Sequence, residues 1–235
     1  MTTFRIGTST CSVCGHSSQH MDITSSIELG HPDLDLRPSE LARSTMSHWL
    51  QACPACGYVA PYLSDPTKAT RAWLASDTFR SLDGLDPERL PFLAETFYHR
   101  HKICLIDGDP VRAAHNLLHA AWACDDEGLA DLARELRLRC IRLIDENPSP
   151  AWDEDDARMV RVDILRRAGL FDRAIEECTR APFEGEILVQ VADFEVELAR
   201  KHDDGRYTVG DAIGESEEID PRYVEDDDPD EDLIG

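Results

Sequence analysis

Hydrophobic residues between positions 87 and 200 recur three and four positions apart, which is the spacing of one face of an α-helix. Proline, glycine and acidic residues interrupt this pattern and divide it into six segments. The apolar stripes of the segments begin at Leu90, Val111, Leu129, Ala157, Ala174 and Ile187. The pattern predicts a mainly α-helical domain of about six amphipathic helices joined by short loops.

The dipeptide Asp-Pro occurs three times ahead of such segments, with its aspartate at Asp65, Asp86 and Asp109. An aspartate side chain accepts hydrogen bonds from the free N–H groups of a first helical turn, and proline suits the first helical position. We therefore expect helices to begin at these three dipeptides.

Two of the predicted helix pairs have the length and the turn of a tetratricopeptide repeat. Residues 149–182 span one repeat, with the turn at Gly169 and a closing Pro182, and Gly108 marks a second turn after a helix over 87–107. The helix predicted over 129–146 departs from this period. The sequence thus predicts a tetratricopeptide-like helical domain over residues 64–210, and we expect it to fold without the residues that precede it.

The first 63 residues have a different pattern. Residues 20–29 have strand character and are expected to pair with residues 4–6, whereas residues 38–51 have helical spacing. Residues 31–38 are interpreted as a proline-bounded loop whose Leu34 and Leu36 pack on the same small domain. The two aspartates and Arg37 of this loop leave a functional role open.

Two C-x-x-C pairs, Cys11 with Cys14 and Cys53 with Cys56, are each followed directly by glycine. Two thiolates three positions apart can reach one ion across a tight turn, and glycine permits the positive φ that turns backbone N–H groups toward the sulfurs. We predict one structural Zn²⁺ held by these four cysteines in a zinc ribbon over residues 1–63. The alternative, a dithiol redox pair, needs a single pair near a βαβ unit.

Histidines are the other candidate metal ligands. They form two groups, His16, His20, His31 and His48 in or beside the ribbon, and His99, His101, His115 and His119 in the predicted helices. A histidine of the first group is an alternative to one cysteine. His115 and His119 have the spacing that places two imidazoles over one metal ion, but no H-E-x-x-H motif accompanies them, and a histidine beside an apolar stripe also suits a helical core.

The four remaining cysteines fall on or next to the apolar stripes of the helices: Cys104, Cys124, Cys140 and Cys178. A free cysteine in such a place behaves as a small hydrophobic residue. A nucleophilic or redox role would need a base or a cation beside the thiol, and the sequence identifies neither. It also contains no glycine-rich phosphate loop and no G-x-S-x-G motif.

Charge narrows the classes of partner. The formal net charge is −23 at pH 7, and residues 1–63 contain only three arginines and no lysine, so nucleic acid is a poor default partner. Residues 211–235 are predicted to be an acidic, disordered tail. Residues 1–6 lack the apolar core of a signal peptide, and no apolar run approaches the roughly 20 residues that span a bilayer, so we expect a cytoplasmic protein.

Taken together, the knuckle Cys53-Pro-Ala-Cys56-Gly-Tyr58, the helical run over residues 113–142 and the loop over residues 33–38 resemble a family of uncharacterised bacterial proteins. In that family a C-P-x-C-G-Y zinc knuckle precedes tetratricopeptide-like helices. The resemblance implies the architecture and the metal, and it implies no substrate.

These patterns favour a non-enzymatic zinc-binding helical-repeat protein that acts as a protein–protein interaction module or adaptor, with a protein partner that the sequence does not name. The first alternative is a zinc-ribbon nucleic-acid or transcription-associated factor. The second is a metalloenzyme with a histidine site near His115 and His119.

Overall fold

A computed structural model describes residues 2–215, which are mainly α-helical, as predicted. Three two-stranded antiparallel sheets come first. Their strands are β1 (Thr3–Thr10), β2 (Ser17–Ser25), β3 (Glu28–Leu29), β4 (Glu40–Leu41), β5 (Gln51–Ala52) and β6 (Val59–Ala60). The helices are α1 (Arg71–Leu74), α2 (Asp77–Arg80), α3 (Phe92–Asp107), α4 (Pro110–Asp126), α5 (Ala130–Glu146), α6 (Asp155–Arg167), α7 (Phe171–Thr179), α8 (Glu186–Arg200) and α9 (Val209–Ile213). Two 3-10 helices cover Arg43–His48 and Pro150–Trp152.

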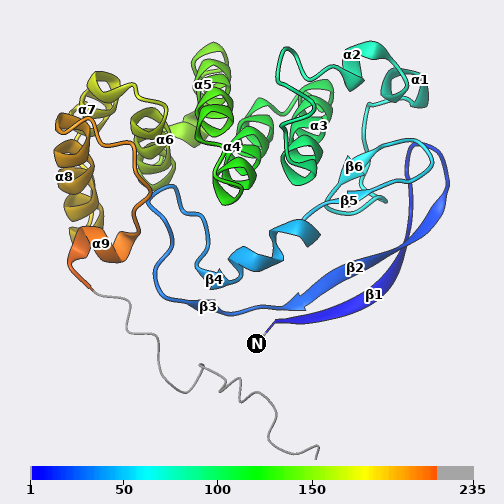
Figure 1. Cartoon of the computed structure of the whole chain (residues 1–235), viewed down its shortest axis with the longest axis horizontal. Coiled ribbons are helices and arrows are strands. Elements are labelled where there is room, and N and C mark those ends of the chain that lie inside the picture. The colour runs from blue at the N-terminus through cyan, green and yellow to red at the C-terminus, as the bar shows by residue number, and fades with distance from the viewer. Residues whose placement is uncertain (1, 216–235) are drawn as a thin grey trace, which may run out of the picture.

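The helices α3–α8 form a curved row, and the strands β1–β4 run along the open side of that row (Figure 1). The N-terminal segment passes from the α3 end, where β5 and β6 lie, to the α8 end. There it meets the C-terminal part of the described chain, since Asp33 pairs with Thr208 in an isolated β-bridge. The segment between the two cysteine pairs therefore spans the helical row.

The six helices predicted from the apolar stripes are confirmed as α3–α8, but only one of the three predicted helix starts is correct. Asp109 accepts a hydrogen bond from the N–H of Arg112 at 2.9 Å and caps α4. Asp86 instead accepts from the N–H of Glu88 at 3.0 Å within a turn, and α3 begins after Pro91. No helix starts at Asp65 in the described chain, because α1 begins only after Thr70. Asp-Pro suits a turn as well as a helix start.

Three connections in the row have the same turn. The helices α3, α4 and α6 are each followed by a glycine with positive φ, at Gly108, Gly128 and Gly169. In each case the next N–H donates to a carbonyl five residues earlier, as Asp109 does to Cys104 at 2.9 Å. The sequence pattern identified Gly108 and Gly169 but not Gly128. The tetratricopeptide likeness of the helix pairs stays a prediction.

The pairing predicted between residues 4–6 and the strand after residue 20 is confirmed, since Phe4 pairs with Ile23 and Ile6 with Met21 between β1 and β2. The predicted strand ends earlier than expected, at Ser25, and residues 28–29 form β3, which pairs with β4. The short helix predicted over residues 38–51 is present only as the 3-10 helix at Arg43–His48. The strands β4 and β5 occupy the two ends of that range. These strands pair with β3 and β6, which lie outside that range, and a helical spacing within the range does not report such pairing.

The hydrophobic core of the N-terminal region continues into the helices. Tyr58, Val59 and Leu63 are buried in one cluster with Phe79 of α2 and Ile103 of α3. An Nη atom of Arg100 in α3 also donates to the carbonyl of Val59 at 3.2 Å. The predicted domain boundary at 63/64 therefore falls inside a shared core, and independent folding of the helical part loses its support.

The loop over residues 33–38 packs on the helices and not, as predicted, on the N-terminal region. Leu34 is 1% exposed and belongs to the main helical core cluster, whereas Leu36 is 48% exposed. The N–H of Leu34 donates to the carbonyl of Tyr207 at 3.0 Å, and Val209 donates to Pro32 at 2.9 Å. The loop is thus part of the helical core.

This placement predicts that alanine substitution of two leucines in the same loop lowers the free energy of unfolding by different amounts. Leu34→Ala should lower the free energy of unfolding by about 2 to 5 kcal/mol, because it leaves a cavity in a packed core. Leu36→Ala removes the same atoms from an exposed position and should change it by about 0.5 kcal/mol or less. Urea unfolding of both variants measures the difference. Equal costs would contradict the burial described for Leu34.

The end of the described chain is ordered around α9, so residues 211–213 of the predicted tail are helical. The hydroxyl of Thr208 accepts from the N–H of Asp211 at 3.1 Å, and the Asp211 carboxylate accepts from the N–H of Thr208 at 2.7 Å. Residues 216–235 of the predicted tail lie outside the described residues. Among the helices of residues 2–215, none is long and apolar enough to cross a membrane.

Candidate metal centre

The four predicted ligand cysteines lie on two turns of the same construction. Cys11 and Cys14 occupy the turn between β1 and β2, and Cys53 and Cys56 the turn between β5 and β6. In the first turn the N–H of Cys11 donates to the carbonyl of His16, and in the second Cys53 donates to Tyr58, at 2.9 and 2.8 Å. The glycines that follow have φ of 74° and 75°, as predicted from the C-x-x-C-G pattern.

The structure brings the four sulfur atoms together, all within 4.8 Å of one another. Cys11 Sγ lies 3.7 Å from Cys56 Sγ, and Cys14 Sγ lies 3.6 Å from Cys53 Sγ. A disulfide needs its sulfurs at about 2.05 Å, so these are four free thiols around one point. Both close contacts join one turn to the other, and an ion between them would therefore connect β1–β2 to β5–β6.

The surroundings of the sulfurs suit a bound cation. Burial raises the pKa of the Cys11 and Cys56 thiols, so their thiolate forms need a nearby positive charge. The pKa of Cys14 is lowered to about 7, chiefly because the backbone N–H of His16 donates to its sulfur. Backbone donors thus already point at the thiols. The arrangement can hold a metal ion once the protons leave.

The histidines proposed as alternative ligands lie in other contacts. His119 packs against the rings of Trp49, Phe97 and Trp122, with centroids 4.7 to 5.3 Å away. His115 stacks on Trp152 with the ring centroids 5.0 Å apart. Within residues 2–215, only the four cysteines form a group of three or more side chains placed to hold a metal ion.

The two histidines of α3 also have protein partners. Nδ1 of His101 lies 3.0 Å from the carbonyl oxygen of Ala113 in α4, and the His99 ring stacks on Phe79 with centroids 4.7 Å apart. In β2, His20 Nε2 lies 2.8 Å from the hydroxyl of Ser18. These imidazoles pack against other side chains or form hydrogen bonds within the protein. This agrees with the alternative considered for His115, a histidine of the helical core that binds no metal.

His101 gives a testable pH dependence. Burial disfavours its charged form and lowers its pKa to about 4, whereas the unfolded chain takes up that proton near pH 6.5. Unfolding is therefore coupled to proton uptake, and the contribution of His101 is complete above pH 6.5 and lost as the pH falls toward 4. His101→Asn keeps an N–H donor for Ala113 but cannot be protonated.

As the pH falls from about 6.5 to about 4, the free energy of unfolding of the wild-type chain should decrease relative to that of His101→Asn. The decrease should be up to about 1.4 kcal/mol for each pH unit. Urea unfolding of both proteins at several pH values measures this difference, in which the titrations that they share cancel. A difference that stays constant from pH 7 to pH 4.5 would contradict the buried, neutral imidazole.

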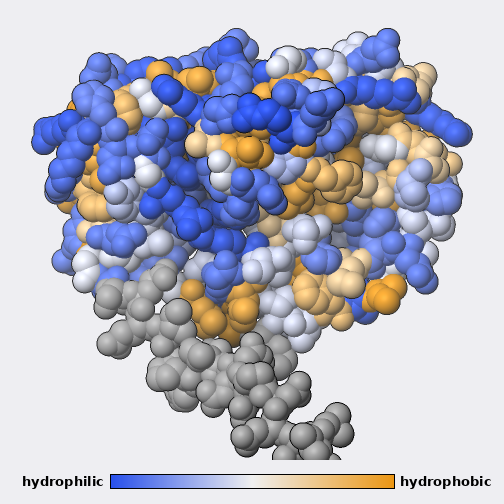
Figure 2. Space-filling view, viewed as in Figure 1, coloured by the Kyte–Doolittle hydropathy of each residue, from blue (hydrophilic) through white to orange (hydrophobic). Residues whose placement is uncertain are grey.

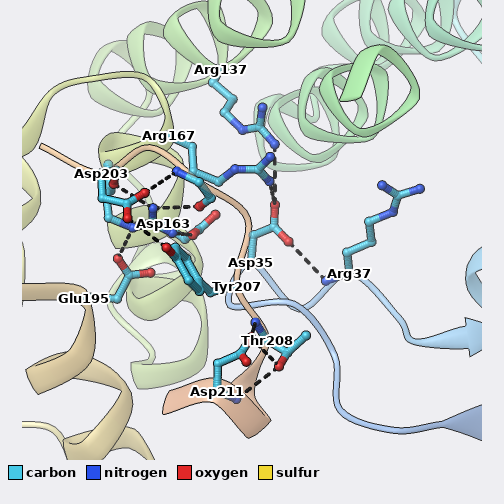
Figure 3. A network of polar contacts seen from close by, with 12 residues as sticks. Asp35, Arg37, Arg137, Asp163, Arg167, Glu195, Asp203, Tyr207, Thr208 and Asp211 are labelled. Carbon is cyan, nitrogen blue, oxygen red and sulfur yellow. Dashed lines mark hydrogen bonds and ion pairs between the residues drawn. The ribbon is translucent and has the colours of Figure 1, made fainter. Parts of the chain in front are cut away.

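A buried ionic network connects the N-terminal region to the helices, and sequence reasoning missed it. Asp35 is 2% exposed and accepts a hydrogen bond from Trp122 Nε1 at 2.6 Å. The guanidinium groups of Arg137 and Arg167 approach the same carboxylate at 3.9 and 3.6 Å, as Figure 3 shows for these three charged residues. Arg37 pairs with Asp126 at 2.5 Å. The sequence pattern drew attention to the two aspartates and Arg37 of the loop. It contains no local signal for Arg137 and Arg167 of the helices.

A second part of the network lies beneath it. Arg166 pairs with Glu195 of α8 at 2.5 Å and with Asp163 at 2.6 Å, and all three are buried. Its remaining donors reach the carbonyls of Asp203 and Gly205 at 2.9 and 2.8 Å. Burial is the main cause that raises the pKa of Glu195 to about 8. These pairs fasten α6 to α8 and to the segment that leads into α9.

The four helical cysteines are buried, as predicted. Burial raises their pKa to about 11 for Cys104 and to about 12 for Cys124, Cys140 and Cys178. Thiols with such pKa values remain protonated at neutral pH and are poor nucleophiles. They serve as small hydrophobic residues of the helical core.

Comparisons of the chain with protein-family models, with curated proteins and with solved structures give no match. The resemblance to zinc-knuckle proteins of bacteria therefore stays a prediction from the sequence.

Proposed function

We propose that this chain is a non-enzymatic zinc-binding protein whose helical row acts as a protein–protein interaction module. The observation that carries the proposal is the closed set of four cysteine sulfurs. A tetrahedral zinc ion with four protein thiolates has no open position for water or substrate, so its role is structural.

The sulfur geometry supports zinc as the ion. Zinc–thiolate bonds of about 2.3 Å in a tetrahedron place the sulfurs about 3.8 Å apart. The two shortest distances described between the turns, 3.6 and 3.7 Å, are close to that value before any ion is added. Four thiolates with no carboxylate or water also disfavour magnesium, calcium and manganese, which prefer oxygen ligands.

Zinc would then fix both ends of the segment between Cys14 and Cys53. That segment contains the loop over residues 33–38, whose Leu34 and Asp35 lie in the helical core. The ion would hold β1–β2 against β5–β6 at one end of the row while the loop fastens the other. Metal binding and the shape of the helical surface are thereby linked.

The distribution of charge supports a protein partner over a nucleic acid. Of the three arginines in residues 1–63, Arg37 pairs with Asp126 and Arg43 with Asp33, at 2.5 and 2.6 Å. Only Arg5 is left largely exposed, so few cations are available for phosphate contacts. The formal net charge of −23 favours a partner with a basic surface.

The proposal is tested by metal analysis together with binding assays on the full chain. We expect one zinc per chain by mass spectrometry of the purified protein, no salt-sensitive retention on heparin, and specific capture of a protein partner by a crosslinked bait. Two zinc ions per chain, or a chain without zinc, would contradict the single closed site. Retention on heparin that disappears with salt would favour the nucleic-acid alternative instead.

A further inference from the structure

The strand β1 has one unpaired edge along its whole length. It pairs only with β2, in a two-stranded sheet, and no backbone hydrogen bond within residues 2–215 reaches its outer side. Figure 1 shows β1 on the outside of the molecule, away from the helices. Proteins usually protect such edges with proline, lysine, a short length or a covering element, and β1 extends over eight residues with neither of these residue types.

One face of this hairpin is apolar and exposed. Ile6 is 69% exposed, its cross-strand neighbour Met21 is 45% exposed, and Phe4 beside them is 42% exposed. Figure 2 shows hydrophobic surface over the part of the molecule where the hairpin lies. The opposite face points at the protein, because Asp22 accepts a hydrogen bond from Gln51 of β5 at 2.9 Å. The hairpin thus presents Ile6 and Met21 to solvent and a polar face to the body, while the Phe4 ring lies 4.8 Å from that of His48.

The charge of the hairpin suits contact with another copy of the same chain. Residues 3–25 contain one arginine and one acidic residue, Arg5 and Asp22, so this part is neutral in a strongly acidic protein. Within one copy Arg5 Nη2 lies only 3.9 Å from Asp22 Oδ2, and the arginine side chain is mostly exposed. The Asp22 carboxylate lies over Gly7, where a Cβ atom would collide with it. A cation placed opposite Gly7 would therefore meet that carboxylate.

We propose that β1 pairs with β1 of a second copy, antiparallel, about a two-fold axis that places Ile6 opposite Ile6 of that copy. The result is a four-stranded sheet in which Met21, Ile6 and the same two residues of the second copy form one apolar row. Arg5 of each copy then lies opposite Gly7 of the other, next to Asp22. The contact is self-complementary and pairs the free β1 edge of each copy with that of the other, as a closed two-fold interface requires.

Chemistry selects this register over its neighbours. Residues opposite each other in an antiparallel pair point to the same face of the sheet. In a symmetric pairing the residue at the two-fold axis therefore lies opposite the same residue of the second copy, and the alternative registers differ in which residue that is. With the axis at residue 5, Arg5 would face Arg5 of the second copy, and like charges opposite each other are unfavourable. With the axis at residue 7, Arg5 would face Ser9 and Ile6 would face Thr8, which loses both the ion pair and the apolar row.

The mass of the full chain in solution tests the pairing. Light scattering during size-exclusion chromatography, from micromolar to millimolar protein, should show the mass rise from 26.4 kDa toward twice that value. Ile6→Lys should weaken dimerisation about tenfold or more, because it places two lysines opposite each other at the axis. Ile187→Lys is the matched control, a change of the same kind at a 55% exposed position of α8, and should leave the dimer intact.

A thiol at the axis tests the register. Ile6→Cys should form a disulfide between two copies under mild oxidation, whereas Thr8→Cys should not, since the two Thr8 positions would lie about 14 Å apart along the strands. Zinc content and circular dichroism of each variant check that it is folded. A chain that stays monomeric throughout, a dimer that Ile6→Lys leaves unchanged, or crosslinking at Thr8 and not at Ile6 would overturn the proposal. A monomer that binds an extended peptide along β1 would assign the edge to another protein.

Discussion

A fragment of residues 64–210 is expected not to fold cooperatively, although its six long helices each have an apolar stripe. Removal of the first 63 residues exposes Phe79 and Ile103, which are buried against Tyr58, Val59 and Leu63. It also removes Leu34 from the helical core. At about 1.5 to 3 kcal/mol for each fully buried side chain, the loss of these contacts is comparable to the about 5 to 15 kcal/mol by which a domain of this size is stable.

The same fragment loses charged partners as well. Arg137 and Arg167 would keep Asp125 but lose Asp35, and Trp122 would lose the acceptor of its Nε1–H. Buried polar groups without partners cost additional stability. Circular dichroism during urea titration is the measurement, with the chain of residues 1–215 as control. A steep unfolding transition of the fragment, equal to that of the control, would show that the helices are an independent domain.

Cys53→Ser is expected to be the most damaging single substitution. Metal-coupled folding of small four-ligand sites has apparent free energies of about 10 to 16 kcal/mol, and loss of one thiolate removes a large part of that contribution. Cys53 is itself buried in the cluster shared with the helices, so the loss would spread to α2 and α3. The variant should therefore retain less zinc and unfold at a lower urea concentration. Its free energy of unfolding should be lower by several kcal/mol.

The matched control is Cys124→Ala, which removes a fully buried sulfur from the helical core without touching the metal centre. It should cost about 1 kcal/mol or somewhat more, as deletion of one buried heavy atom does. Measurements of zinc content and urea unfolding separate the two effects. If Cys53→Ser keeps a full equivalent of zinc and costs no more than Cys124→Ala, the four-cysteine site is not the structural centre described here.

Local features of the fold were predictable from the sequence because their causes are local. The C-x-x-C-G pattern contains both the cysteines and the glycine that its turn requires, and Cys11, Cys14, Cys53 and Cys56 lie together as expected. The stripes of α3–α8 and the strand character of the residues that pair with residues 4–6 follow from side-chain period, whereas the register of that pairing comes from the structure. These features depend on residues that are close together in the sequence or that repeat at a fixed spacing.

The features that were missed depend on contacts between distant residues. Asp35 meets Arg137 and Arg167 from more than 100 positions away, and neither arginine differs in pattern from the exposed Arg134 and Arg142 of α5. Leu34 and Leu36 have identical side chains two residues apart, and only the path of the loop across the helical row decides which one is buried. A single sequence contains no local signal for that path.

The central claim is that a structural metal centre and the helical row form one cooperative unit. Urea unfolding of the zinc-loaded chain tests it most directly when two signals are followed together, the helical circular dichroism and the release of zinc to an indicator. We predict a single transition in which both signals change at the same urea concentration, because the two cysteine-containing turns and the helices share a core. Release of zinc in a separate, earlier transition that leaves the helical signal intact would contradict the claim.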